Sequence, residues 1–155
     1  MKKLALGLAL ALIFSSLATA RLIETFSYEE LYEKSDLVVI VELVTVSESK
    51  EILSGWGEPD RYEGKVSQFS VGKVLKGNAD ILTISLLHFA YSAKVLLIAN
   101  GANFVDFSNA EKYHYLMFLN EGDEGVFSPV TGHYDAAASV MKIVREQSSP
   151  ILNEK

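Results

Sequence analysis

Apolar and polar residues follow one another in short stretches along most of this chain, a pattern typical of β-strands rather than of helices. The longest stretch runs from Leu37 to Val46 and is rich in β-branched residues, whose stiff side chains disfavour a helix. Its first half is apolar at every position, which predicts a strand in the centre of a sheet. Further strands are expected at these segments: Val66 to Leu75, Ile81 to Leu87, Tyr113 to Leu119, Val126 to Val130 and Val140 to Val144.

The connections between these segments carry turn residues. A long hydrophilic loop is expected from Ser47 to Gly64, and the turn Lys76 to Asp80 should join two antiparallel strands. The apolar spacing before that turn breaks at Gly72, which predicts a β-bulge there. Asn100-Gly101 is typical of a type I′ hairpin turn between two apolar runs.

One short helix is predicted before the first strand, over Tyr28 to Lys34. Ser27 and Glu30 have the spacing of a capping box, in which each side chain accepts a hydrogen bond from the other residue's backbone N–H. Phe26 and Leu31 stand where a hydrophobic staple would join the two sides of the cap. One face of the helix is expected to pack on the strands through Tyr28, Leu31 and Tyr32.

The first twenty residues have the parts of a signal peptide. Lys2 and Lys3 precede an apolar run from Leu4 to Phe14, and Ala18-Thr19-Ala20 fits a cleavage site. The run is short of the roughly 20 apolar residues that cross a bilayer. We therefore expect a secreted or periplasmic protein with no stable membrane anchor after cleavage.

Charge and cysteine content then narrow the function. The 155-residue chain carries 14 basic and 20 acidic residues, and cleavage after Ala20 would leave 12 and 20, a formal charge of −8. Such a chain repels phosphate backbones, so nucleic acid is not an expected partner. Cysteine is absent, which excludes disulfides, thiol nucleophiles and thiolate zinc sites.

Five or six strands, one short helix and no internal repeat predict one mainly β domain, a small barrel or a sandwich. The expected organisation is a signal peptide over residues 1–20, a single domain over residues 21–145 and a loose tail over residues 146–155, which contains serine, proline and charge.

Three segments in this order resemble the netrin-like domain: Phe26 to Val39, which ends in Ser-Asp-Leu-Val-Val, Val74-Leu75-Lys76-Gly77, and Tyr113 to Leu119. That family includes the tissue inhibitors of metalloproteinases. The resemblance implies a small OB-like antiparallel barrel of five or six strands with the short helix before it. In those inhibitors the reactive ridge begins with a cysteine, whereas Arg21 would lead here, so their activity is not carried over.

Two groups of residues are candidates for a site. His133 and Asp135 lie two apart in a turn and could together hold a metal or pass a proton. The alternative is an Asx-type turn with a solvated histidine. Trp56, between two glycines, and nearby Tyr62 offer aromatic rings for a sugar or a protein partner, unless Trp56 folds back over one end of the barrel. His114 lies in a strand and is expected to have its partner on one face of the sheet.

The residues fit a non-enzymatic binding module for a protein or glycan, without a cofactor or a metal, because the sequence contains no catalytic motif that we recognise. The alternative is a metal-dependent or hydrolytic enzyme that uses His133 and Asp135. A third reading is a structural component of the cell envelope with no discrete site.

Overall fold

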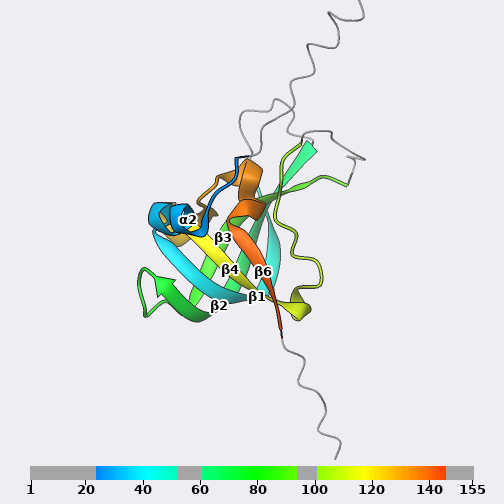
Figure 1. Ribbon diagram of the computed structural model, residues 1–155. Helices are drawn as coiled ribbons and strands as arrows, with labels where there is room; N and C mark the ends of the chain where they lie inside the picture. Colours follow the sequence, from blue (N-terminus) through cyan, green and yellow to red (C-terminus); the bar gives the residue numbers. More distant parts are fainter. Residues whose placement is uncertain (1–23, 52–60, 94–100, 146–155) are drawn as a thin grey trace, which may run out of the picture.

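The fold is mainly β. The computed structural model describes residues 24–51, 61–93 and 101–145, and this part contains one α-helix and a six-stranded sheet (Figure 1). The helix is α2 (Tyr28–Lys34), and three short 3-10 turns are η2 (Ala110–Lys112), η3 (Asp123–Gly125) and η4 (His133–Ala138). The strands are β1 (Leu37–Ser49), β2 (Tyr62–Lys76), β3 (Thr83–Tyr91), β4 (Tyr113–Glu121), β5 (Val126–Pro129) and β6 (Val140–Val144).

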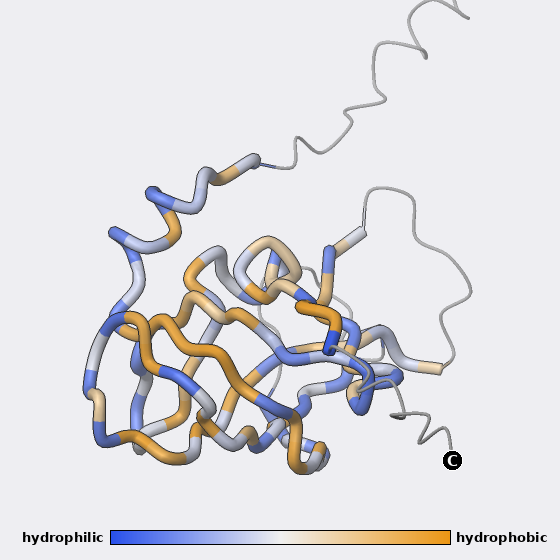
Figure 2. Tube along the Cα trace, turned by 60° about the horizontal axis from the view of Figure 1, so that its bottom comes forward, coloured by the Kyte–Doolittle hydropathy of each residue, from blue (hydrophilic) through white to orange (hydrophobic). Residues whose placement is uncertain are grey.

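Helix α2 has the predicted bounds and the predicted cap. The Glu30 N–H donates to Ser27 Oγ at 3.2 Å, and the Ser27 N–H donates to a Glu30 carboxylate oxygen at 2.7 Å. Leu31 is buried against Val38 of β1 and Phe118 of β4, so α2 covers the outer side of these two strands. Figure 2 shows a mainly hydrophilic helix with one short apolar stretch, as packing on one side only requires.

The expected packing face of α2 was wrong in part. Tyr28 and Tyr32 remain 64% and 43% exposed, while Leu31 is 1% exposed. The helix is short and is held mainly by Leu31, so the two tyrosine rings lie at the margins of the contact, where the Tyr28 ring still packs on Phe118 of β4 at a centroid distance of 6.2 Å. The Tyr32 hydroxyl instead donates a hydrogen bond to the carbonyl of Leu75 at 3.2 Å.

The strands follow one another in the order β1-β2-β3-β5-β4, and β1 also pairs with β4, so the pairings form a ring. Strand β6 adds to β4 along Tyr113 to Met117. The first half of β1 is paired on both edges, as its uniformly apolar sequence predicted. The ring is closed unevenly, because β3 and β5 share two residue pairs whereas β2 and β3 share nine.

One pairing differs in direction from the antiparallel arrangement that the sequence suggested. Strands β3 and β5 run parallel where Ser85 and Leu86 face Val126 and Phe127. The turn around η3 reverses the chain after β4, and β5 therefore runs antiparallel to β4 and alongside β3 in the same direction. The other pairings among the described strands are antiparallel.

The main core lies inside the ring. Alternate residues of β1, such as Leu37 and Val39, point into it, while Val38 between them points out to α2. The largest side chains that are almost fully enclosed in this core are Phe69, Leu86, Tyr115, Met117 and Leu119.

The predicted bulge at Gly72 is confirmed. Ile40 pairs with Lys73 and Val41 with Val71, which leaves Gly72 without a partner in β1. Two further shifts of register lie at Leu75 and Val44, and both of these side chains are exposed. The three irregularities bend the long β1–β2 pair, which lets a sheet of few strands curve round the core.

The structure extends several predicted strands and leaves some predictions untested. The first strand continues to Ser49 and the second begins at Tyr62, so the long connection is shorter than expected. The last strand has the predicted bounds. The leader, the centre of the β1–β2 connection, the segment before Gly101 and the C-terminal tail lie outside the described residues.

Gly77 is required by the turn after β2. Its φ is +102°, and a Cβ there would lie 2.9 Å from the carbonyl oxygen of Asp36 and 2.9 Å from a methyl group of Leu37. We expect Gly77→Ala to lower the free energy of unfolding by about 2 kcal/mol, since it adds a steric clash to the cost of a positive φ. Urea denaturation measures this loss.

The matched control is Gly125→Ala. Gly125 has a φ of +74°, but a Cβ at this position would meet no atom within 4 Å beyond its chain neighbours. The variant therefore carries the backbone cost alone, about 1 kcal/mol. Equal losses in the two variants would show that the close approach to Asp36 and Leu37 is unimportant.

Candidate functional site

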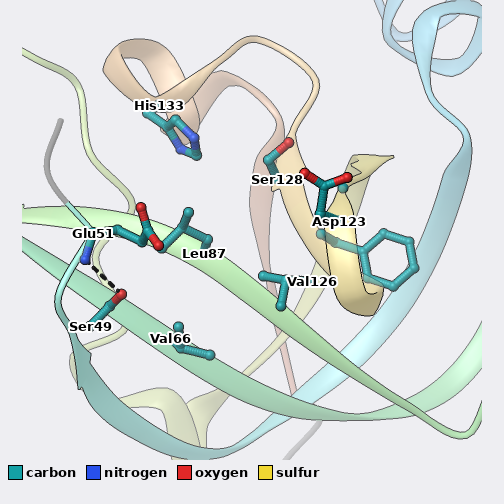
Figure 3. Close-up of a pocket in the computed structure, with 10 residues that line it drawn as sticks. Ser49, Glu51, Val66, Leu87, Asp123, Val126, Ser128 and His133 are labelled. Atoms are coloured by element: carbon teal, nitrogen blue, oxygen red, sulfur yellow. Dashed lines mark hydrogen bonds between the residues drawn. The ribbon is translucent and has the colours of Figure 1, made fainter. Parts of the chain in front are cut away.

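A hollow of about 520 Å³ opens on the outer face of β2 and β3. Val66 of β2 and Leu87 of β3 lie opposite each other in the pairing register and form its floor, and Val126 of β5 continues the floor (Figure 3). The remaining lining residues come from the other elements: Ser49, Glu51, Gly122, Asp123, Phe127, Ser128 and His133. We call this hollow the main groove.

Local structure positions both walls of the main groove. On one side, the Glu51 N–H donates to Ser49 Oγ at 3.1 Å, which bends the chain at the end of β1. On the other side, the Gly122 N–H donates to the carbonyl of Val126 at 3.0 Å and closes the turn that carries Asp123. Figure 3 shows the carboxylates of Glu51 and Asp123 on opposite sides of the apolar floor.

The charge of the main groove is negative. Glu51 and Asp123 supply two carboxylates, and neither forms an ion pair with any part of the chain that the structure describes. No lysine or arginine is among the lining residues. The groove therefore presents acidic groups on both sides of apolar residues and favours cationic groups.

His133 lies at the rim of the main groove, on η4. Its ring packs edge-on against Phe89 at a centroid distance of 5.0 Å, and its Nδ1 is buried without a hydrogen-bond partner among the described residues. Burial lowers the pKa of His133 below its usual value, because the charged imidazolium loses hydration. At neutral pH the ring is therefore uncharged and leaves the groove's negative charge intact.

A smaller hollow of about 310 Å³ adjoins the main groove on the same face. Its lining includes Gln68 and Ser85, each two residues along its strand from the floor residues Val66 and Leu87. Gly125 also lines it, next to Val126 of the main groove. Side chains two apart in a strand lie on one face, so the two hollows form one elongated depression.

The structure places one member of the predicted pair, His133, at the main groove. Both belong to η4, but Asp135 has φ and ψ of −121° and 31°, which kinks the turn between them. Thr131 Oγ1 donates to the Asp135 carbonyl at 2.8 Å, so this segment is fixed through its backbone. His133 lines the main groove and Asp135 does not, and the described residues contain no group of three side chains suited to hold a metal.

The two aromatic candidates have different outcomes. Tyr62 is half-buried in a cluster of rings, with centroid distances of 5.5 Å to Phe104, 5.9 Å to Tyr91 and 6.4 Å to Tyr134. Its edge and tilted contacts hold the segment after Gly101 and η4 against β2, so it has a packing role. Trp56 lies outside the described residues.

His114 has the partner that its place in a strand predicted. Its Nδ1 lies 3.2 Å from a carboxylate oxygen of Glu42, and the other oxygen of Glu42 accepts from Arg145 at 2.7 Å. This trio joins β1, β4 and the end of β6 on a face away from the main groove.

A third hollow, of about 510 Å³, lies under residues 102–108. Its two charged lining residues already form ion pairs, Lys65 with Glu63 at 3.1 Å and Asp106 with Lys142 at 3.1 Å. These pairs leave few polar groups to orient a ligand, so the main groove is the better candidate.

Sequence reasoning missed Glu51, Asp123 and Ser128. Glu51 and Asp123 are 72 positions apart and are brought to one groove by the pairing of β1 with β2, of β2 with β3 and of β3 with β5. The usable signal was local, because each carboxylate stands just after the end of a strand, where side chains project from the rim of a sheet.

Comparison with models of known protein families gives no match, and comparison with curated protein sequences gives no significant match. Within the described ranges, no helix is both long and apolar enough to span a bilayer.

Proposed function

We propose that this chain is an exported binding module built on an OB-like barrel, and that its partner, a protein or a glycan, occupies the main groove. The ring of pairings supports the barrel, because OB folds have the strand order β1-β2-β3-β5-β4 with β1 returning to β4. The parallel contact between β3 and β5 fits the same order. The proposed barrel is also the fold that the resemblance to the netrin-like domain implies.

The position of the main groove is the observation that carries the binding function. OB folds bind ligands on the face of their second and third strands, between the β1–β2 and β4–β5 connections. Here Val66 and Leu87 form the floor, Glu51 begins the β1–β2 connection and Asp123 lies in the β4–β5 connection. The main groove therefore lies where an OB fold binds its ligands, and the OB fold itself is proposed from the strand pairings.

Binding is favoured over hydrolysis by the contacts of His133. A general base needs a hydrogen-bonded partner or substrate group within reach and is usually oriented by a second group. No described side chain hydrogen-bonds to His133 Nδ1, and no serine or threonine of the groove contacts the ring through a hydrogen bond. The lining therefore supplies recognition groups without an assembled nucleophile and base.

Export is supported by the charged, apolar and small-residue parts of the first twenty residues. N-terminal sequencing of the protein recovered outside the cytoplasm is expected to begin at Arg21. Recovery of the intact leader in the cytosol would contradict the proposed export.

Binding is tested by amide chemical shifts of the ¹⁵N-labelled protein against two sets of probes, short peptides and neutral oligosaccharides. A member of one set is expected to shift the amides of Val66, Leu87 and Val126. Ser128→Trp should abolish these shifts, because the indole fills the groove.

Ile143→Trp is the control, since Ile143 lies on β6 and is already 39% exposed. It should bind as the unmodified protein does. If neither set of probes shifts the groove amides, or if Ser128→Trp binds normally, the groove is not the binding site and the proposal is wrong.

A further inference from the structure

We infer that the depression on the β2–β3 face takes a basic, extended peptide segment of a protein partner, with apolar side chains on the floor and lysine or arginine side chains toward Glu51 and Asp123. This inference rests on the proposed binding function and names the chemistry of the ligand. It departs from the nucleic acids and oligosaccharides that OB folds commonly bind.

The length of the depression favours an extended chain. It runs along β2 from Gln68 to Val66 and along β3 from Ser85 to Leu87, and then reaches His133 at the far end of the main groove. An extended peptide advances about 3.3 Å per residue and turns alternate side chains to one face. Several residues of such a peptide can therefore lie on the floor, and the side chains between them can point to the walls.

The arrangement of charge favours basic side chains. Glu51 and Asp123 are exposed, lie on opposite walls and have no ion-pair partner among the described residues. A long lysine or arginine side chain can rest its methylene groups on the floor and place its charge beside either carboxylate. The net charge of −6 for the whole chain draws the same ligands from a distance.

The lining offers little to a sugar. Carbohydrate recognition relies on exposed aromatic faces, and the described aromatic rings of the groove are Phe127 and His133. Phe127 is 7% exposed, and His133 is packed edge-on against Phe89. Phe127 therefore presents no open face and His133 offers one small ring, whereas Val66, Leu87 and Val126 present the aliphatic surface that peptide side chains cover.

Fluorescence anisotropy with three labelled probes tests the inference: a short peptide of alternating lysine and valine, its counterpart with glutamate in place of lysine, and a neutral oligosaccharide. The basic peptide is expected to bind, and its affinity should fall as salt is added. Glu51→Gln and Asp123→Asn should each weaken binding about threefold, and the double variant about tenfold, as for partly exposed ion pairs.

Glu29→Gln and Glu111→Gln are the matched controls. They remove the same charge from exposed positions on α2 and η2, away from the groove. The double control should leave the affinity unchanged to within about twofold. A loss equal to that of the groove variants would show that the peptide responds to the net charge of the protein, which would overturn the inference.

The outcomes separate the two proposals. If the oligosaccharide or the acidic peptide shifts the groove amides and the basic peptide does not, the binding function stands and the inference is wrong. If the basic peptide binds but Ser128→Trp leaves its affinity unchanged, the peptide lies elsewhere and both proposals fail.

Discussion

Replacing Phe69 with alanine is expected to lower the free energy of unfolding by about 4 kcal/mol, as for other large aromatic side chains removed from a core. Phe69 is fully buried, and its ring lies 5.2 Å from that of Phe107 and 6.2 Å from that of Tyr115. It joins β2 to β4 across the inside of the ring. Its loss leaves a cavity that the paired strands cannot close. Urea denaturation at neutral pH measures the change.

The contrasting variant lies in the same cluster. Tyr115 is fully buried, and its hydroxyl has no hydrogen-bond partner within the described residues. Tyr115→Phe removes this unsatisfied group and keeps the ring, so it should leave the stability unchanged or raise it by about 1 kcal/mol. A loss of similar size in both variants would mean that the hydroxyl is hydrogen-bonded in the folded protein.

The stability of the protein is expected to fall by about 3 kcal/mol between pH 7 and pH 4 because of His88 alone. His88 is 4% exposed, and its Nε2 lies 2.8 Å from Ser67 Oγ. Burial is the main cause that lowers its pKa from 6.5 to about 4.

The sign follows from proton binding. As the pH falls below 6.5, His88 takes up a proton in the unfolded chain but stays neutral in the folded one until about pH 4. The unfolded state is therefore favoured progressively across this window, and this contribution is complete below pH 4. Urea denaturation at several pH values gives the slope of stability against pH.

His88→Gln should reduce that slope, whatever its effect on stability at pH 7. His114→Gln is the control, because His114 is partly exposed and paired with Glu42. The pKa of His133 is lowered by burial, like that of His88, so part of the slope of stability against pH should remain. An unchanged slope in His88→Gln would show that His88 is protonated in the folded protein well above pH 4.

Local signals in the sequence predicted much of the fold. Ser27 and Glu30 satisfy each other's backbone groups within one turn, so no distant residue was needed to place α2. Gly72 broke the alternation of its own strand, and the bulge is there. The limits of such reasoning appear at Tyr28 and Tyr32, whose exposure depends on how much of β1 and β4 a seven-residue helix can cover.

The candidate site was harder to predict, because its residues meet through strand pairing. His133 was singled out for a partner two residues away, yet its neighbours in space are Phe89 and the residues of the main groove. Glu51 and Asp123 gave no sign of acting together, since an acidic residue at the end of a strand is usually a solvated one. The register that joins them is a property of the whole sheet.

The short parallel contact between β3 and β5 has a consequence for ligand binding. Two residue pairs join these strands, the fewest of any pairing in the ring. The floor of the main groove spans this contact, with Leu87 on one side and Val126 on the other. A molecule that rests on both side chains contacts β3 and β5 at the same time. Its binding therefore disfavours local separation of these two strands, and their separation weakens its binding.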